Sequence, residues 1–175
     1  RDLAEHYLEA GHAVVGCSRG ASDLVHERYT HHALDVADET AVRRMVRDTV
    51  ETHDTIHVLI NNAGIASMNP VALTPVPTAR SILETNFLGT FLLCRDVAKV
   101  MLKRDFGRIV NLSTVATPLQ LEGEALYAAS KAAVESLTRI LSRELGPSGV
   151  TVNAGKRWTR FFPARPSRGS ARSRT

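Results

Sequence analysis

The chain has 175 residues, of which 43% are hydrophobic and 23% charged, a composition typical of one folded globular domain. No apolar run approaches the roughly 20 residues that cross a bilayer, and the first residues do not form a basic-then-apolar secretory signal. The net charge of +4 is unevenly placed, because residues 156–175 hold seven of the 22 basic side chains and no acidic one. Residues 1–155 carry 15 basic and 18 acidic side chains, which argues against nucleic-acid binding by the domain.

Taken in chain order, the apolar pattern alternates between helix and strand. The first segment predicts a helix that ends at Gly11, since glycine suits the left-handed position after a last turn. Residues 38–53 have amphipathic helical spacing. Two more helices are expected over residues 78–105, closed by Gly107, and over residues 122–141. The expected strands are AVVGCS (13–18), HHALDV (31–36), IHVLINNAG (56–64), GRIVNLS (107–113) and VTVNA (150–154).

These strands are apolar along their whole length, which is typical of a parallel sheet covered by helices on both faces. The sequence therefore predicts an α/β fold with a doubly wound, Rossmann-like parallel sheet. In such sheets ligands bind outside the carboxyl ends of the strands. The polar or small residues expected at those ends are Ser18 and Arg19, Asp35 and Val36, residues 61–64, and Ser113 and Thr114.

The helix over residues 122–141 places Tyr127 and Lys131 four residues apart, on one face of an Ala-rich stretch. A tyrosine loses its proton at about pH 10, and a cation held beside it lowers the pKa of the phenol towards neutral pH. Such a pair can donate and accept a proton. On spacing alone, an aromatic ring packed against a lysine stem is the commoner explanation.

Hydroxyl groups precede this helix. Ser113 and Thr114 end the strand before it, where a hydroxyl can hydrogen-bond a substrate carbonyl and stabilise developing negative charge. A helix or turn cap explains a Ser-Thr pair at that place equally well.

Two asparagine-containing segments are also candidates. In NNAG (61–64), Gly64 permits close approach or a positive φ, although a plain strand-ending turn has the same residues. Asn86 stands inside a predicted apolar helix, where asparagine is unfavourable, and this misfit suggests a use such as holding a water beside Lys131. The alternative is an Asn that faces solvent.

In this order, these segments resemble the short-chain dehydrogenase/reductase family, in particular its 3-oxoacyl-(acyl carrier protein) reductase-like branch, from residue 1 to about residue 154. The family's Tyr-x-x-x-Lys motif matches YAASK, which implies that Tyr127 is the catalytic acid/base and that Lys131 is its partner and also holds the nicotinamide ribose. The resemblance implies a water-mediated proton relay at Asn86. It implies cofactor contacts at Asp35, Val36, Asn62, Ala63 and Gly64, beside the adenine and its ribose.

The chain departs from the family pattern at the catalytic hydroxyl. The family's serine lies thirteen residues before its tyrosine, and counting back from Tyr127 reaches Thr114, with Ser113 one residue earlier. Threonine keeps the hydroxyl but is stiff at χ1. Spacing favours Thr114, and a shift of one residue in the loop would bring in Ser113 instead.

Both ends of the chain depart from the family as well. The family's glycine-rich phosphate-binding turn precedes the first helix, whereas this chain begins inside that helix at Arg1. The central strand of the sheet would be missing with it, and hydrophobic strand edges would be exposed. We therefore expect a partial Rossmann-like domain over residues 1–155, incomplete at both ends. Residues 156–175 form a basic tail that we expect to be disordered or the product of a shifted reading frame.

The nicotinamide cofactor is expected to be NADP rather than NAD. An acid at the end of the second strand of such a sheet selects NAD, whereas an arginine accommodates the 2′-phosphate of NADP. GCSRG offers Ser18 and Arg19 and no acid, and Asp23 comes only in the following turn. A solvated surface charge is the simpler explanation of Arg19. None of the His, Cys or carboxylate residues shows the spacing of a closed metal site.

These residues predict an NADP-dependent oxidoreductase that transfers a hydride between nicotinamide and a ketone or secondary alcohol. The expected partners are a small carbonyl or alcohol substrate and, by resemblance, a second copy of the chain in a homo-dimer or homo-tetramer, with no specific nucleic acid and no membrane. Cys17 and Cys94 lie in apolar surroundings, which predicts a reduced, cytoplasmic setting. The competing predictions are a non-catalytic fragment with little cofactor binding and anion binding through the basic tail.

Overall fold

The computed structural model describes residues 1–155, and the predicted basic tail lies outside the described residues. Every strand pairing in it is parallel. The strands are β1 (Val14–Ser18), β2 (Tyr29–Ala33), β3 (Val58–Asn61), β4 (Gly107–Leu112) and β5 (Val150–Gly155). The helices are α1 (Asp2–Glu9), α2 (Glu39–His53), α3 (Val76–Leu83), α4 (Gly89–Leu102), α5 (Ala116–Leu119) and α6 (Ala125–Leu145), with a π-helical turn between α3 and α4 (Glu84–Leu88) and 3₁₀ turns at Val71–Leu73 and Gly146–Ser148. None of the described helices is long and apolar enough to cross a membrane.

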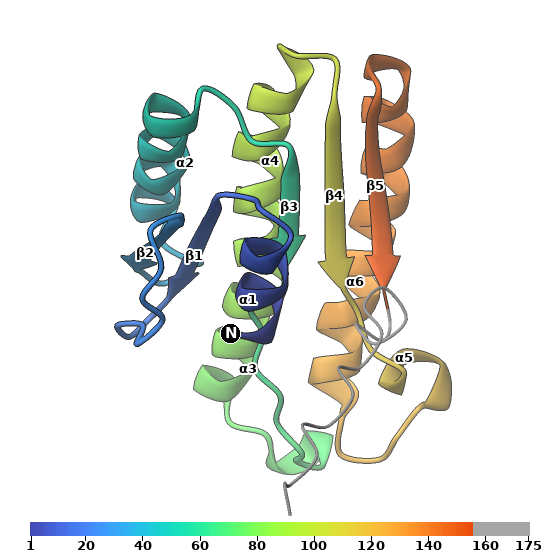
Figure 1. Ribbon diagram of the computed structural model, residues 1–175. Helices are drawn as coiled ribbons and strands as arrows, with labels where there is room; N and C mark the ends of the chain where they lie inside the picture. The colour runs from blue at the N-terminus through green and yellow to red at the C-terminus, as the bar shows by residue number, and fades with distance from the viewer. Residues whose placement is uncertain (156–175) are drawn as a thin grey trace, which may run out of the picture.

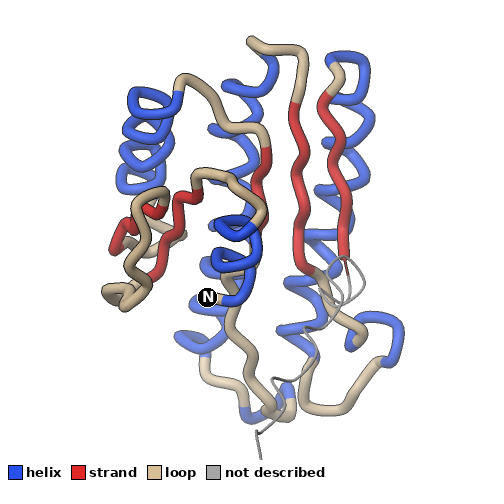
Figure 2. Tube along the Cα trace, viewed as in Figure 1, coloured by secondary structure: helices blue, strands red, loops and turns tan. Residues whose placement is uncertain are grey.

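The helices and strands form layers, as the sequence predicts for a doubly wound α/β fold. Helices α4 and α6 lie behind the sheet of β3, β4 and β5, and α2 packs against α4 (Figure 1). Helix α1 lies on the opposite side (Figure 2). Within residues 1–155, α1 is the helix that covers this second face. Helices therefore lie on both faces of the sheet, as predicted, but they cover one face far more fully than the other.

The sheet is divided into two parts. Strands β1 and β2 form one pair, and β3, β4 and β5 form a separate sheet with β4 in the middle. A cavity of about 970 Å³ separates β1 from β3 and is lined by both strands and by α1. Within the described residues, β1 and β3 each lack a hydrogen-bonded neighbour on the side that faces the cavity, in agreement with the predicted incomplete sheet that lacks its central strand.

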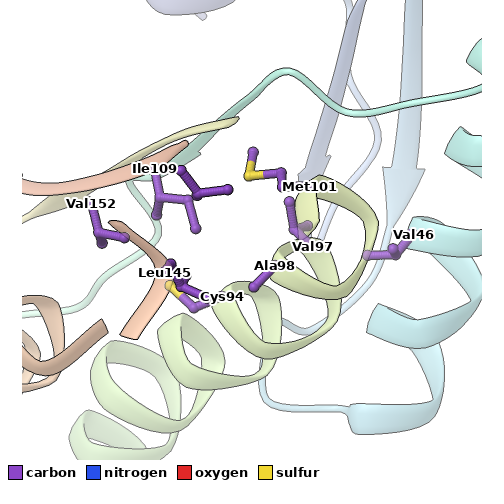
Figure 3. Packing of buried hydrophobic residues seen from close by; sticks show 9 residues of the cluster. Val46, Cys94, Val97, Ala98, Met101, Ile109, Leu145 and Val152 are labelled. Carbon is purple, nitrogen blue, oxygen red and sulfur yellow. The ribbon is translucent and has the colours of Figure 1, made fainter. Parts of the chain in front are cut away.

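The hydrophobic core lies mainly between the three-stranded sheet and α4. Met101 and Cys94 of α4 and Ile109 of β4 are fully buried in one cluster, and Leu145 of α6 closes it (Figure 3). A smaller cluster joins Val36 and α2 to α4. Apolar side chains on the inner faces of α4 and α6 therefore fix the three-stranded sheet on these helices.

Local signals explain most element boundaries. Asp38 caps α2, because its Oδ1 accepts hydrogen bonds from the backbone N–H groups of Thr40 and Ala41. Gly11 has a φ of +90° just after α1, as its position predicts. Strand β2 begins at Tyr29 and ends at Ala33, earlier than the predicted 31–36, since the Asp35 carboxylate accepts from the Ala37 N–H and turns the chain there. The predicted helix over residues 78–105 exists, but with a π-helical turn at its centre.

Candidate active site

Lys131 is a buried cation on α6. Its side chain is only 5% exposed, and Nζ donates a hydrogen bond of 2.8 Å to the carbonyl oxygen of Leu112 at the end of β4. Burial lowers the pKa of the Lys131 ammonium, because water no longer solvates the charge. Tyr127 lies one helical turn earlier on α6 and is half-buried. The helix thus presents a phenol and an ammonium at the same end of the sheet.

Asn86 lies in the π-helical turn and is fully buried, which excludes the solvent-facing alternative. Its Oδ1 accepts from the Ile65 N–H at 2.8 Å, and its Nδ2 donates to the Ile65 carbonyl at 2.9 Å and to Ser130 Oγ at 3.0 Å. Ser130 Oγ in turn donates to the Tyr127 carbonyl at 2.7 Å. A π-helical turn inside an α-helix is frequent at functional sites. Here it places an asparagine between the chain after β3 and the Tyr127–Lys131 segment.

Gly64 lies beside both Asn86 and Lys131. A Cβ on Gly64 would lie 3.3 Å from Asn86 Oδ1 and 3.4 Å from Lys131 Nζ. The absence of a side chain at Gly64 therefore lets its backbone pack closely against these two polar groups. The structure brings together Gly64, Asn86 and Lys131, which the sequence singled out on three different elements.

The two hydroxyls after β4 have different surroundings. Ser113 Oγ donates to Glu135 Oε1 of α6 at 2.5 Å, and this bond engages its proton. Thr114 is buried, and its Oγ1 accepts from the Ala116 N–H at 3.1 Å, so its own proton remains a donor. The Thr114 contact is also the turn cap that its sequence allows. Of the two candidates, Thr114 has the hydroxyl that can still donate to a carbonyl.

Seven of the predicted cofactor residues line one cavity, whereas Tyr127 and Lys131 do not. This cavity lies between β1 and β3 and has a volume of about 970 Å³. Asp35 is exposed, whereas Val36 is buried against Gly89, where a Cβ would lie 2.6 Å from Val36 Cγ2. The predicted residues at its wall are Ser18, Arg19, Asp35, Val36, Asn62, Ala63 and Gly64.

Asn61, the first residue of NNAG, has a different place. Its Nδ2 donates to Asn111 Oδ1 at 2.7 Å and to Cys94 Sγ at 3.2 Å, and Asn111 Nδ2 donates to Thr138 Oγ1 at 2.9 Å. Burial raises the pKa of the Cys94 thiol to about 11. Within the described residues, Asn61 Oδ1 is buried without a hydrogen-bond partner. This buried polar group joins β3, β4, α4 and α6 below the candidate site.

Sequence reasoning missed Ser130, Glu135, Asn111 and Thr138. Ser130 offered a signal, because it is a polar residue between Tyr127 and Lys131 in an otherwise Ala-rich helix. Asn111 also interrupts an apolar strand. The partners of these side chains come from distant segments, so the pattern of one segment does not reveal them.

The cavity suits the adenosine end of a dinucleotide. Its volume of about 970 Å³ is that of a small-molecule pocket, and Gly64 at its wall packs against Lys131 and Asn86, which do not themselves line it. The predicted adenosine contacts at its wall are Ser18, Arg19, Asp35 and Val36. Within residues 1–155, no group of three or more His, Cys, Asp or Glu side chains could hold a metal ion.

Known proteins resemble this chain. A family model described as short chain dehydrogenase matches residues 1–156. A 3-oxoacyl-[acyl-carrier-protein] reductase of Synechocystis sp. is 36% identical over 69% of the chain and 49% of the relative. The structure of ElxO with NADP bound superposes with a TM-score of 0.82 at 28% identity, over 87% of this chain and 65% of that one. An NAD⁺-bound xylitol dehydrogenase gives a TM-score of 0.70 at 31% identity, over 72% and 49%. The chain spans about half to two thirds of the length of the curated relatives that it matches.

Proposed function

Because the chain belongs to the short-chain dehydrogenase family, we propose that it is an NADP-dependent oxidoreductase that reduces a ketone or oxidises a secondary alcohol. The observation that supports this proposal most directly is the close packing of Gly64, Asn86 and Lys131. Tyr127 lies one helical turn away from Lys131 on α6. Enzyme relatives and NADP-bound and NAD⁺-bound neighbours support it. A bound nicotinamide would supply or accept the hydride, and the residues of this chain would handle the proton.

Each side chain has a separate role in this proposal. Tyr127 donates a proton to the carbonyl oxygen of the substrate, or takes it from the alcohol. Lys131, as a cation, stabilises the phenolate that remains. The Thr114 hydroxyl hydrogen-bonds the same substrate oxygen and stabilises its developing charge. Asn86 holds the backbone after β3 and, through Ser130, the Tyr127 turn in their relative positions.

The preference for NADP rests on the turn after β1. Ser18 and Arg19 are exposed at the cavity and can bind a 2′-phosphate. Asp23, the nearest acid in the following turn, accepts from Arg1 at 2.7 Å and is therefore already paired. An acid that selects NAD by binding the ribose 2′-OH is thus replaced by an arginine and a hydroxyl.

The substrate class remains a proposal of the same kind. Similarity to a 3-oxoacyl-[acyl-carrier-protein] reductase favours a 3-oxoacyl thioester, a ketone with a neighbouring polar carbonyl. A homo-oligomer that packs through α4 and α6, with no specific nucleic-acid partner and no membrane, completes the proposal. Two free thiols, Cys17 and Cys94, are consistent with the predicted reducing cytoplasmic setting.

A non-catalytic chain is the second candidate, and one observation favours it. The sheet is divided between β1 and β3, next to the cavity that the cofactor needs. A cofactor fluorescence titration separates the two candidates, since the non-catalytic chain would bind neither NADPH nor NADH.

Replacing Tyr127 with Phe tests the catalytic role. We expect Tyr127→Phe to lower kcat by about a hundredfold to ten-thousandfold with little change in NADPH affinity, because only the proton-transferring hydroxyl is removed. The measurement is NADPH oxidation with a 3-oxoacyl thioester. Ser142→Ala, about four helical turns further along α6, is the control and should keep turnover within about threefold, as expected for loss of a hydroxyl away from the reacting atoms. Near-parental turnover in Tyr127→Phe would contradict the assignment.

A further inference from the structure

A chain of hydrogen bonds lies behind the Ser18–Arg19–Gly20 turn. Tyr29 and His31 are two residues apart on β2 and therefore on the same face of the strand. Tyr29 Oη lies 3.0 Å from His31 Nδ1, and His31 Nε2 lies 2.9 Å from the Gly20 carbonyl oxygen and 3.1 Å from Ser18 Oγ. Both side chains line the same cavity as Ser18 and Arg19.

Gly16 makes this arrangement possible. In the β1–β2 register, Gly16 is opposite His31, and a Cβ on Gly16 would lie only 2.5 Å from Tyr29 Oη. The absence of a side chain there lets the Tyr29 ring lie across β1 and reach the imidazole. Gly16 of β1 and Tyr29 and His31 of β2 therefore pack against one another.

The chemistry of the partners assigns the protons. A carbonyl oxygen only accepts, so His31 Nε2 carries the hydrogen that bonds Gly20 O. Nδ1 of the neutral imidazole is then an acceptor, and Tyr29 Oη is its donor. Ser18 Oγ also donates to the Gly20 carbonyl, at 2.9 Å. Two donors, Ser18 and His31, therefore share a single carbonyl.

We propose that His31, oriented by Tyr29, is a positioning residue that frees the Ser18 hydroxyl for a 2′-phosphate, and this rests on the proposed NADP-dependent function. When the Ser18 hydroxyl donates to a phosphate oxygen instead of the Gly20 carbonyl, His31 still donates a hydrogen bond to that carbonyl. Without His31, Ser18 would be the remaining side-chain donor to that exposed carbonyl, so binding of the phosphate would exchange the Ser18 hydrogen bond for one from water. The pair on β2 thus favours a 2′-phosphate without touching it.

The test compares two probes that lack nicotinamide, adenosine 2′,5′-bisphosphate and adenosine 5′-monophosphate, by calorimetric titration of the full chain. We expect His31→Leu to reduce the preference for the bisphosphate about tenfold while monophosphate affinity stays within about twofold, since one hydrogen-bond network is lost. His31→Gln keeps an N–H donor and should recover the preference to within about threefold of the parent. Tyr29→Phe keeps the aromatic ring and should reduce the preference for the bisphosphate about threefold, because it removes only the hydrogen bond that orients the imidazole.

His32→Leu is the matched control, because it removes the neighbouring histidine of β2, whose side chain points to the other face of the strand. Its preference should equal that of the parent.

The outcomes separate this inference from the proposed function. An unchanged preference in His31→Leu, or an equal loss in His32→Leu, overturns the role of His31 alone. A parent chain that binds the bisphosphate no better than the monophosphate contradicts the proposed NADP preference, and the inference fails with it.

Discussion

The three-stranded sheet and the β1–β2 pair are built in different ways. In the first, Ile109 and Asn111 of β4 are fully buried, and helices α4 and α6 pack behind the strand. In the second, the β1 residues from Val14 to Cys17 are only half-buried, and the polar contacts around His31 lie at the surface. Burial of apolar area is the main source of stability. The three-stranded sheet is therefore the more stable region, and the β1–β2 pair opens more easily.

The two regions carry residues with different proposed roles. Lys131, Asn86 and Thr114, which we propose act with Tyr127 in proton transfer, are buried on the elements of the three-stranded sheet. Ser18 and Arg19, proposed to select the cofactor, are exposed on the β1–β2 pair. The groups that transfer a proton must be held in a fixed geometry relative to the substrate. The turn that selects the cofactor needs only to be held in place on the surface. Changes in the first region should alter stability and kcat, and changes in the second should alter cofactor affinity.

The largest effect on stability is expected at Asn111. Asn111→Ala removes the buried hydrogen bonds to Asn61 Nδ2 and Thr138 Oγ1, each of which keeps one other partner, and leaves a cavity, so it should lower the free energy of unfolding by about 3 kcal/mol. Urea denaturation measures this. Asn153→Ala, at an exposed position of β5, is the control and should cost less than about 0.5 kcal/mol. Equal costs at both positions would refute the buried polar group as a source of stability.

Lys131 should have an effect of opposite sign. Its pKa is lowered by burial, so the folded chain binds the proton less tightly than the unfolded chain. The cost in stability is full below the folded-state pKa and disappears as the pH rises towards the unfolded value of 10.5. Lys131→Met should therefore stabilise the fold by about 1 kcal/mol at neutral pH while it abolishes turnover.

The measurement is urea denaturation at neutral pH and again near pH 10. The gain from Lys131→Met should shrink at the higher pH. Lys103→Met, at an exposed position after α4, should show no such dependence. A gain that grows with pH would mean that the buried ammonium does not destabilise the chain.

The smallest effect is expected where the two regions meet. Asp96 of α4 accepts hydrogen bonds from Arg95 and Lys99, and Arg95 also pairs with Glu39 of α2 at 3.0 Å. Burial alone would raise the pKa of the Asp96 carboxyl, but the hydrogen bonds outweigh it and lower the pKa. Its contribution is present above the unfolded value of 3.8 and is lost as the pH falls through the folded-state pKa.

Asp96→Asn should thus cost about 0.5 kcal/mol at neutral pH and nothing at low pH, as expected for a partly exposed ion pair. Thermal denaturation at both pH values measures the difference. Asp48→Asn, which breaks an exposed pair with Arg47, should cost less at every pH. A cost at Asp96 that does not change in acid would exclude this charge as its source.

The sequence predicts much of this architecture because its signals are local. The Asp38 cap, the turn at Gly11 and the spacing of Tyr127 and Lys131 depend on a few neighbouring residues, and the corresponding helices form. The membership of the short-chain dehydrogenase family, implied by YAASK and NNAG, is confirmed. The catalytic and cofactor roles of the residues stay predictions.

Other features depend on contacts between distant segments. The π-helical turn at Asn86 has the apolar spacing of an ordinary helix, and only its bonds to Ile65 and Ser130 distinguish it. The engagement of Ser113 by Glu135 depends on how α6 lies against β4. The division of the sheet, in contrast, agrees with the predicted absence of the central strand.

The central claim is that the proposed proton donor stands on the more stable of two unequal regions, and the two free thiols test it directly. Cys94 is fully buried on α4, whereas Cys17 lies half-buried on β1. Labelling of the unmodified chain with a thiol reagent, followed by peptide mass spectrometry, gives both rates in one experiment. We expect Cys94 to react on the order of a thousandfold more slowly than Cys17, because it becomes accessible only on global unfolding. Equal rates at the two thiols would contradict the claim.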